Sequence, residues 1–407
     1  MIEKPKALIH LGAGEMQIPG IQIAVKLGLH VVTTDQREAA PGARFSHEHW
    51  VISVADVDAL ILKARNLALT HDIVGAYATS DLGVHSVVKI TEALGLRGNS
   101  VASVEACIDK SKALTVWRRL GISVPRGEVL DLKDEALAKI GAMGFPLIVK
   151  PADSCGSQGV LTVSTPESLR AALAEAGRFS RMVIVEEFVD GRHIDVNGMF
   201  LDGAFKPVGM MDRFFTGAPH HLPQWGCLPC HLDDESQSQV YDLLERAARA
   251  LGIDHGPVKG DVIWAARGPV LLEIAPRFHG DVSTQFLPTL AAGIHPAAIW
   301  LSHLANLPPP EAACHSGLYA GWHALFASGE GVVRSIRGMH EAHAVPGVVK
   351  IYLMRAVGEM VAGKIDNRSM CGFVWATASD AESLRNTLHK ATSLIEIETQ
   401  PLTHEHD

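Results

Sequence analysis

The segment Lys150–Val160, KPADSCGSQGV, joins two apolar runs through a loop of small residues. Phe145–Val149 precedes the loop and Val160–Val163 follows it, and both runs are typical of strands, so a hairpin is predicted. The loop differs from a P-loop, in which glycines precede the lysine and the lysine begins a helix. Two interpretations are open at this point: a loop that covers phosphates, and an ordinary hairpin with a mobile tip.

The composition of the loop favours the phosphate interpretation. Small residues let backbone N–H groups approach phosphate oxygens closely, and serine hydroxyls add donors. A lysine at the end of the strand adds a point charge for the same phosphates. The residues concerned are Lys150, Ser154, Gly156, Ser157 and Gly159.

The whole chain limits the classes of function. It has 407 residues, 47% of them hydrophobic, and at about 100–200 residues per domain this length predicts two to four domains. The formal net charge is −9, and acids and bases alternate without a basic run. We therefore expect neither nucleic acid nor an anionic membrane as a partner.

The termini and cysteines indicate a cytoplasmic protein. The start of the chain lacks the long apolar stretch of a signal peptide, and we find no run of about 18 apolar residues, so no membrane span is expected. Six cysteines in a chain of this length do not make a disulfide scaffold, and reduced thiols are expected.

One cysteine pattern has several interpretations. Cys227-Leu-Pro-Cys230-His231 matches the c-type haem attachment signature and also half of a zinc site. Haem attachment normally accompanies export, and zinc needs more ligands, for which only His220 and His221 are close in sequence. We favour a substrate-facing loop with incidental thiols.

The first 108 residues predict a doubly wound parallel domain. Strand-like runs at 6–11, 30–34 and 72–78 alternate with helical patterns. A glycine-rich turn before a helix also begins a dinucleotide site, but Gln17 occupies a position where that motif needs glycine. A nicotinamide-dependent dehydrogenase is therefore disfavoured.

A second informative segment is Gly260–Arg277, GDVIWAARGPVLLEIAPR. Two apolar strands flank a turn, for which we predict a three-residue loop, 266–268, with the glycine left-handed. That register pairs Ala265 with Pro269 and Asp261 with Glu273. Facing carboxylates repel unless a cation bridges them, which predicts Mg²⁺ shared with nucleotide phosphates; two acids on a solvated face are the alternative.

Together these segments resemble the ATP-grasp superfamily, which includes D-alanine–D-alanine ligase, biotin carboxylase and L-amino-acid ligases. The resemblance covers about residues 1–300 and rests on four motifs in order. These are Asp109-Lys110 before a helix that ends at 121–125, the 145–160 segment, Val183–Gly191, which resembles the adenine-binding hinge, and Asp261 with Glu273–Arg277.

The resemblance implies an α/β protein of the α+β grasp type: an N-terminal doubly wound parallel domain at 1–108, a two-lobed ATP-grasp domain at 109–305 and a small C-terminal α+β region at 306–407 that completes the catalytic lobe. A mobile lid is expected at about 120–185. The chain could act as a homodimer.

The resemblance also assigns site residues. Lys110 and Lys150 would contact the α- and β-phosphates, and Arg277 would neutralise the transferring phosphoryl group. The side chain of Glu186 or Glu187, with backbone at Glu187 and Val189, would contact adenine. Phe188 would pack on the hinge, unless it is simply a core aromatic, and His193 falls where the family contacts the ribose.

One position departs from the family pattern. Its last metal motif usually reads Glu-x-Asn-x-Arg, whereas this chain has Ala275 in place of the asparagine. A ligand of a second Mg²⁺ is missing, so one or two ions remain open, with Mn²⁺ as an alternative ion. Both lysines, both acids and Arg277 are present, which favours an active enzyme.

The implied reaction is ATP-dependent ligation. A carboxylate is phosphorylated to an acyl phosphate, and an amine attacks to give an amide, ADP and phosphate. Small-molecule carboxylate and amine substrates are expected, with Arg213, His279 and Gly280 as candidate contacts. The alternatives are a biotin-carboxylase-like or purine-pathway carboxylating enzyme, and a non-catalytic nucleotide-sensing module.

Overall fold

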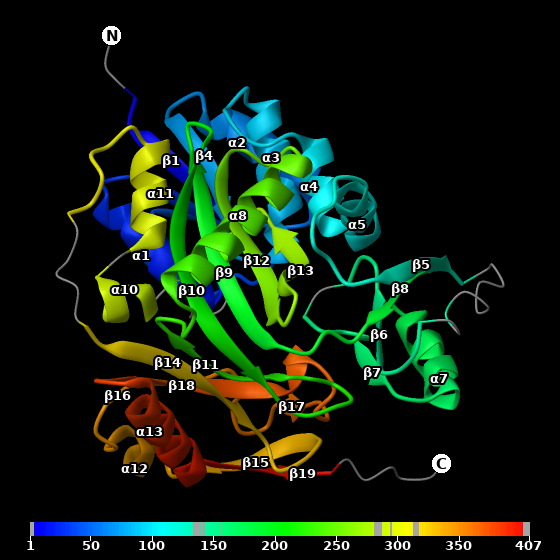
Figure 1. Ribbon diagram of the computed structural model, residues 1–407. Helices are drawn as coiled ribbons and strands as arrows, with labels where there is room; N and C mark the ends of the chain where they lie inside the picture. Colours follow the sequence, from blue (N-terminus) through cyan, green and yellow to red (C-terminus); the bar gives the residue numbers. More distant parts are fainter. Residues whose placement is uncertain are drawn as a thin grey trace, which may run out of the picture.

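The computed structural model describes residues 4–132, 140, 143–154, 156–280, 287–293, 295–311 and 317–401. The chain folds around four sheets, which Figure 1 shows stacked from the N-terminal part to the C-terminal part, with one small sheet set to the side. Among the described residues, no helix is long and apolar enough to cross a membrane.

The first sheet is parallel and has the order β3-β2-β1-β4. Its strands are β1 (Lys6–Leu11), β2 (His30–Asp35), β3 (Glu48–Val51) and β4 (Asp72–Ala78). Helices α2 (Val57–Leu67) and α3 (Asp81–Ala93) bury one face, and α1 (Ile18–Lys26) with α11 (Pro296–Leu304) buries the other. Because both faces are covered, β1 and β2 are buried along most of their length, as parallel strands usually are. The predicted doubly wound arrangement is confirmed.

Two helices connect this sheet to the next part of the chain. They are α4 (Val101–Ile108) and α5 (Lys110–Arg119). Asp109 separates them, and its carboxylate accepts hydrogen bonds from the N–H groups of Ser111 and Lys112. Asp109 is thus the N-cap of α5, and Lys110 is the first helical residue.

The small sheet at the side carries the phosphate-loop hairpin. It is antiparallel, with the order β5-β8-β6-β7, and α7 packs against it. The elements are β5 (Gly127–Asp131), β6 (Leu147–Pro151), β7 (Leu161–Val163), α7 (Pro166–Ala176) and β8 (Met182–Glu187). The hairpin predicted around Lys150 is confirmed by the antiparallel pairing of β6 with β7. Part of the predicted lid, residues 133–139, 141, 142 and 155, lies outside the described residues.

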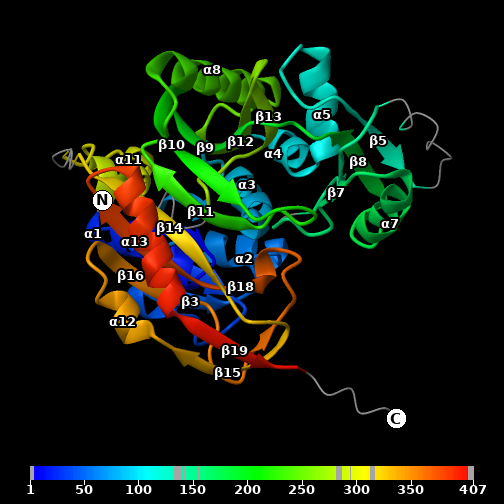
Figure 2. The same cartoon turned by 60° about the horizontal axis from the view of Figure 1, so that its bottom comes forward.

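The largest sheet extends through the rest of the molecule in the order β13-β12-β9-β10-β11-β14-β18-β16. Its first five strands are β13 (Gly268–Ala275), β12 (Gly256–Ala265), β9 (Arg192–Leu201), β10 (Ala204–Phe215) and β11 (Pro223–Leu228), and α8 (Asp234–Ala250) packs on them. The last three are β14 (Tyr319–Phe326), β18 (Met370–Ala378) and β16 (Val348–Leu353). Figure 2 shows α13 (Ala381–Leu394) lying along β14 and β18.

Short elements complete the chain. A three-stranded sheet contains β15 (Gly331–Arg337), β17 (Met360–Val361) and β19 (Glu396–Gln400). The remaining helices are α10 (Leu287–Ala292) and α12 (Met339–His343), with 3₁₀ turns η1 (Glu15–Gln17), η2 (Ala43–Phe45) and η3 (Asn367–Ser369).

The register of the β12–β13 hairpin differs in part from the prediction. Asp261 does face Glu273, and Gly268 is left-handed with φ +93°. However, Ala265 pairs with Gly268, so the predicted pairing of Ala265 with Pro269 is wrong. A bulge between Asp261 and Val262 shifts the register by one residue, which is why the carboxylates still meet.

Candidate active site

A cavity of about 580 Å³ lies where the sheets meet. Its walls come from the start of α3, the junction of α4 and α5, the β6–β7 hairpin with the end of β8, strands β9, β10, β12 and β13, and the C-terminal region. Most of the predicted site residues line it: Lys110, Lys150, Ser154, Gly156, Ser157, Glu186, Glu187, Phe188, Val189, His193, Arg213, Asp261, Glu273, Arg277, His279 and Gly280.

The two predicted lysines both line the cavity. Lys110 Nζ donates to the Ser154 carbonyl at 2.6 Å and lies 3.5 Å from Glu273 Oε2, so it joins the loop to the acids. Lys150 Nζ lies 2.6 Å from Glu186 Oε1, and both side chains are almost completely buried.

The small-residue loop has the backbone that its sequence predicts. Gly156, Ser157 and Gly159 have φ angles of +67°, +61° and +70°. Only glycine adopts this region of φ without strain, so the backbone conformation of Ser157 costs free energy. Gly159 is not among the residues that line the cavity; a Cβ there would lie 2.8 Å from Phe179. Its glycine is required by packing within the loop.

The structure separates the two glutamates of the hinge. Glu186 is buried and faces the cavity, and its Oε2 has no hydrogen-bond partner. Glu187 instead binds Arg126 and Arg267. Burial would raise the pKa of Glu187, but the hydrogen bonds from Arg267 and Arg126 lower it to about 2. Its backbone N–H donates to the Arg126 carbonyl and is therefore already engaged.

The other hinge residues differ in their surroundings. The Phe188 ring lies 5.9 Å from that of His221, so it is a wall of the cavity. Val189 packs with Ile263 and Val270. The ring of His193 lies 4.6 Å from that of Phe215, and burial, with His221 nearby, lowers the pKa of His193 to about 4. His193 is thus neutral at pH 7.

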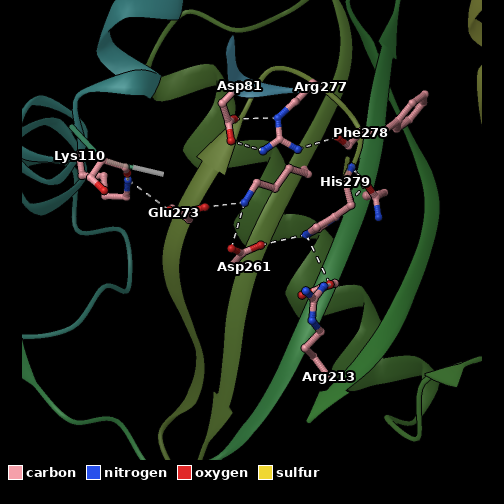
Figure 3. Close-up of polar contacts among 12 residues, drawn as sticks. Asp81, Lys110, Arg213, Asp261, Glu273, Arg277, Phe278 and His279 are labelled. Atoms are coloured by element: carbon pink, nitrogen blue, oxygen red, sulfur yellow. Dashed lines mark hydrogen bonds and ion pairs between the residues drawn. The ribbon is translucent and has the colours of Figure 1, made fainter. Parts of the chain in front are cut away.

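A lysine that the sequence analysis missed bridges the two acids. Lys259 Nζ lies 2.9 Å from Asp261 Oδ2 and 2.5 Å from Glu273 Oε1, and the lysine is buried (Figure 3). Burial opposes its charge, but Asp261 and Glu273 raise the pKa of Lys259. In turn Lys259 and His279 hold the pKa of Asp261 well below its usual range, although burial acts in the opposite sense. Lys259 and Asp261 are two residues apart on one strand, so their side chains project to the same face. This spacing was the signal in the sequence from which Lys259 could have been found.

Arg277 binds an acid of the N-terminal domain. Its Nε and Nη2 donate to the two carboxylate oxygens of Asp81 at 2.7 and 2.6 Å (Figure 3). Burial would raise the pKa of Asp81, but Arg277, Lys259 and Lys110 lower it. The sequence analysis did not identify Asp81, because only the tertiary structure brings the start of α3 to this hairpin.

The candidate substrate residues already have protein partners. Arg213 forms an ion pair with Asp195, and its guanidinium lies 5.0 Å from the Trp322 ring centroid. His279 Nε2 lies 2.9 Å from Asp261 Oδ1, and its Nδ1 lies 3.1 Å from Asn197 Oδ1 (Figure 3).

Gly280 packs closely against the backbone of the protein itself. A Cβ at this position would lie 2.4 Å from the Thr79 carbonyl oxygen. The glycine is thus needed by the fold where the segment after β4 meets the segment after β13.

Ala275, which stands where the family motif usually has asparagine, lines the cavity and offers no ligand atom. The nearest alternative donors form a cluster: Asp195, Asp261 and His279 have potential ligand atoms within 4.8 Å of one another. The carboxylates Asp261 and Glu273 remain suited to Mg²⁺, which prefers oxygen ligands. The unpartnered Oε2 of Glu186 suits an amino group at the other end of the cavity.

The C-terminal region contributes to the same cavity. Trp322, Met370 and Phe373 form an apolar wall, and the N–H of Asn367 donates to the Gly156 carbonyl at 3.3 Å. The 363–372 segment therefore contacts the phosphate loop directly. Arg355 donates to the carbonyls of Met354 and Arg368.

Comparisons with known proteins agree with this geometry. The family model of the D-Ala–D-Ala ligase C-terminus matches residues 116–277, and that of the L-amino acid ligase C-terminal domain 2 matches residues 323–400. The D-alanine–D-alanine ligase of Ectopseudomonas mendocina is 30% identical over 188 residues, which are 44% of this chain and 58% of that ligase. The uncharacterized protein y4rH of Sinorhizobium fredii is 26% identical over 88% of this chain and 74% of its own length.

Solved structures share the whole architecture. The L-amino acid ligase from Bacillus licheniformis has a TM-score of 0.82 at 19% identity, covering 98% of this chain and all of that one. The N5-carboxyaminoimidazole ribonucleotide synthetase from Thermotoga maritima has a TM-score of 0.73 at 17% identity, covering 97% and 100%. The fold and the family matches together define an ATP-grasp protein. The two segments that the family models match are those of carboxylate–amine ligases.

Proposed function

We propose that this protein activates the carboxylate of an amino acid with ATP and joins it to the amine of a second amino acid. The observation that carries the proposal is the convergence of Lys110, Lys150, Asp261, Glu273 and Arg277 around one cavity. The amino-acid substrates are supported by the L-amino acid ligase model over 323–400, which contains part of the apolar wall.

The nucleotide would lie between the small sheet and β12–β13. Glu186 Oε2 would accept a hydrogen bond from the adenine amino group, and Phe188 and Val189 would enclose the base. Lys150 would contact the phosphates from the β6 side and Lys110 from the side of the acids. His193, which is neutral, would contact the ribose by hydrogen bonding.

The acids would hold one Mg²⁺, because Ala275 supplies no ligand for a second ion. When bound, the ion neutralises phosphate charge. Lys259 places a positive charge between Asp261 and Glu273 before nucleotide arrives. Arg277 Nη1 donates to the Phe278 carbonyl and its other donors bind Asp81, so its charge is fixed beside the reacting phosphate.

The reaction balances as two displacements. A substrate carboxylate oxygen attacks the γ-phosphorus, the bond to the bridging oxygen breaks, and ADP leaves. The amine then attacks the acyl carbon, phosphate leaves, and the amine proton is lost to solvent. The loop at 154–159 would cover the phosphates and keep water from the acyl phosphate.

The proposal includes three domains, at 1–108, 109–305 and 306–407, and action on small molecules in the cytoplasm. The domain division is supported by the separate first sheet and by the position of the small sheet. The third part completes the catalytic lobe, since β14, β18 and β16 continue the large sheet from β11.

The test is phosphate release from ATP and Mg²⁺ with L-amino acids supplied singly and in pairs, with mass detection of dipeptides. A parallel series with Mn²⁺ tests the choice of ion. Lys150→Ala and Glu273→Gln should abolish release, whereas Glu330→Gln, an exposed acid, should not. Release that requires bicarbonate and yields no dipeptide would instead indicate a carboxylating enzyme. ATP binding without release across the panel would indicate a nucleotide sensor.

A further inference from the structure

The Cys-x-x-Cys-His motif lies outside the residues that line the active-site cavity. Cys227 is on β11 and faces Asp212 on β10, because the two residues are directly paired across the antiparallel strands. Side chains of such a pair project from the same face of the sheet. His231 follows the end of β11 and returns to the same point: its backbone N–H donates to Asp212 Oδ2 at 2.9 Å, and its ring Nδ1 contacts the same oxygen.

Three different ligand types therefore meet at one place. Potential ligand atoms of Asp212, Cys227 and His231 lie within 4.8 Å of one another. The sequence analysis had considered His220 and His221 as the partners of the cysteines; these histidines line the active-site cavity instead. The acid that completes the cluster was not identifiable from the motif, because it lies on the preceding strand.

A second observation indicates that the cluster lacks a ligand. Asp212 is 2% exposed, and its Oδ1 has no hydrogen-bond partner. A buried carboxylate oxygen without a partner loses its hydration with no compensation. Arg192 does not satisfy this atom, since its Nη2 lies 3.9 Å from the other oxygen, Oδ2, and its side chain is half exposed.

We propose that Asp212, Cys227 and His231 form a Zn²⁺ site. Thiolate, imidazole and carboxylate are the three ligand types of protein zinc sites, and a thiolate disfavours Mg²⁺ and Ca²⁺. On binding, the Cys227 thiol loses its proton to solvent and the sulfur binds the ion. The side chain of His231 is 37% exposed, which gives the ion a route from solvent.

Cys230, the second cysteine of the motif, lies outside the three-atom cluster.

The position of the site gives it a consequence for the active site. Asp212 and Arg213 are consecutive on β10, so their side chains project to opposite faces of the sheet. Arg213 lines the active-site cavity. A metal bound to Asp212 and Cys227 would therefore cross-link β10 to β11 directly behind Arg213. The inference does not depend on the proposed ligase reaction.

The experiment is a metal titration of the full chain after removal of metals with a chelator. Zn²⁺ is added in competition with a chromophoric chelator, in excess Mg²⁺ so that the active-site acids are occupied by the other ion. Co²⁺ is then substituted, because a thiolate-to-cobalt charge-transfer band reports a bound cysteine. We expect one equivalent of Zn²⁺, the charge-transfer band, and a higher midpoint of thermal unfolding in Zn²⁺.

Variants identify the ligands. His231→Ala changes a partly exposed side chain and should weaken Zn²⁺ binding more than about tenfold while leaving the fold intact. Cys227→Ser should abolish the charge-transfer band, and Cys230→Ser should retain both band and binding. His340→Ala, an exposed histidine elsewhere, is the matched control. Absence of stoichiometric Zn²⁺ binding, or binding unchanged by both His231→Ala and Cys227→Ser, would overturn the proposal.

Discussion

Arg277 and Asp81 form a bidentate ion pair between segments 196 residues apart, with 2.6 Å between Arg277 Nη2 and Asp81 Oδ2. Asp81 begins α3, which packs on the first sheet, and Arg277 follows β13 of the large sheet. The arginine expected to act on the phosphoryl group is thus oriented by a distant segment of the chain. A fork-shaped pair fixes the plane of the guanidinium as well as its position.

We expect Asp81→Asn to lower kcat for phosphate release by about 10- to 100-fold, because the guanidinium loses the partner that fixes its orientation. Steady-state kinetics with the best amino-acid pair would measure this change. Asp58→Asn, on the exposed side of α2, should behave as wild type. A wild-type kcat for Asp81→Asn would show that the pair does not position Arg277.

Lys259→Met should destabilise the protein by about 2 kcal/mol in the absence of Mg²⁺. The substitution removes the cation that lies between Asp261 and Glu273, and the partial exposure of both acids limits the cost. Urea unfolding would measure the loss, with Lys63→Met as the control. Added Mg²⁺ should recover more stability in Lys259→Met than in wild type; equal recovery in both would argue against repulsion as the cause.

Glu186→Gln should reduce the preference for ATP over GTP by about tenfold. The free carboxylate oxygen can accept from the adenine amino group but would repel the guanine carbonyl oxygen. The ratio of Kd values for the two nucleotides is the measurement. Glu187→Gln should affect stability and leave this ratio unchanged, since Glu187 binds Arg126 and Arg267. The idea fails if the two variants alter the ratio equally.

Stability should fall as the pH decreases from about 6.5 to 4. Burial is the largest cause that lowers the pKa of His10, His193, His255 and His323 to about 4 each. Between that value and the usual 6.5 the unfolded chain binds protons that the folded chain does not, so acid favours unfolding. Each histidine contributes up to about 1.4 kcal/mol per pH unit in this interval.

Urea unfolding at pH 7, 6 and 5 would measure this dependence. His323→Asn should reduce the slope of stability against pH, whereas His340→Ala, at an exposed position, should leave it unchanged. A flat profile across this interval would contradict the assignment of buried, neutral histidines.

Local patterns in the sequence were enough to predict much of the fold. Alternating strands and helices identified the parallel sheet, and the small residues after Lys150 identified the loop whose left-handed φ angles the structure contains. The pairing of Asp261 with Glu273 was predicted correctly although the turn register was not, because a bulge compensated for the shift. Bulges leave little trace in a single sequence.

The sequence by itself determined the superfamily, the order of the elements and the motif residues that line the cavity, because these depend on periodicity and on motifs within one or two strands. The tertiary structure alone decided which charges neutralise one another. Lys259 bridges the acids, Asp81 orients Arg277, Glu187 points to two arginines while Glu186 faces the cavity, and Asp212 meets Cys227. Ion pairs and metal clusters depend on distances of a few ångströms between segments far apart in the chain, and only the folded backbone sets those distances.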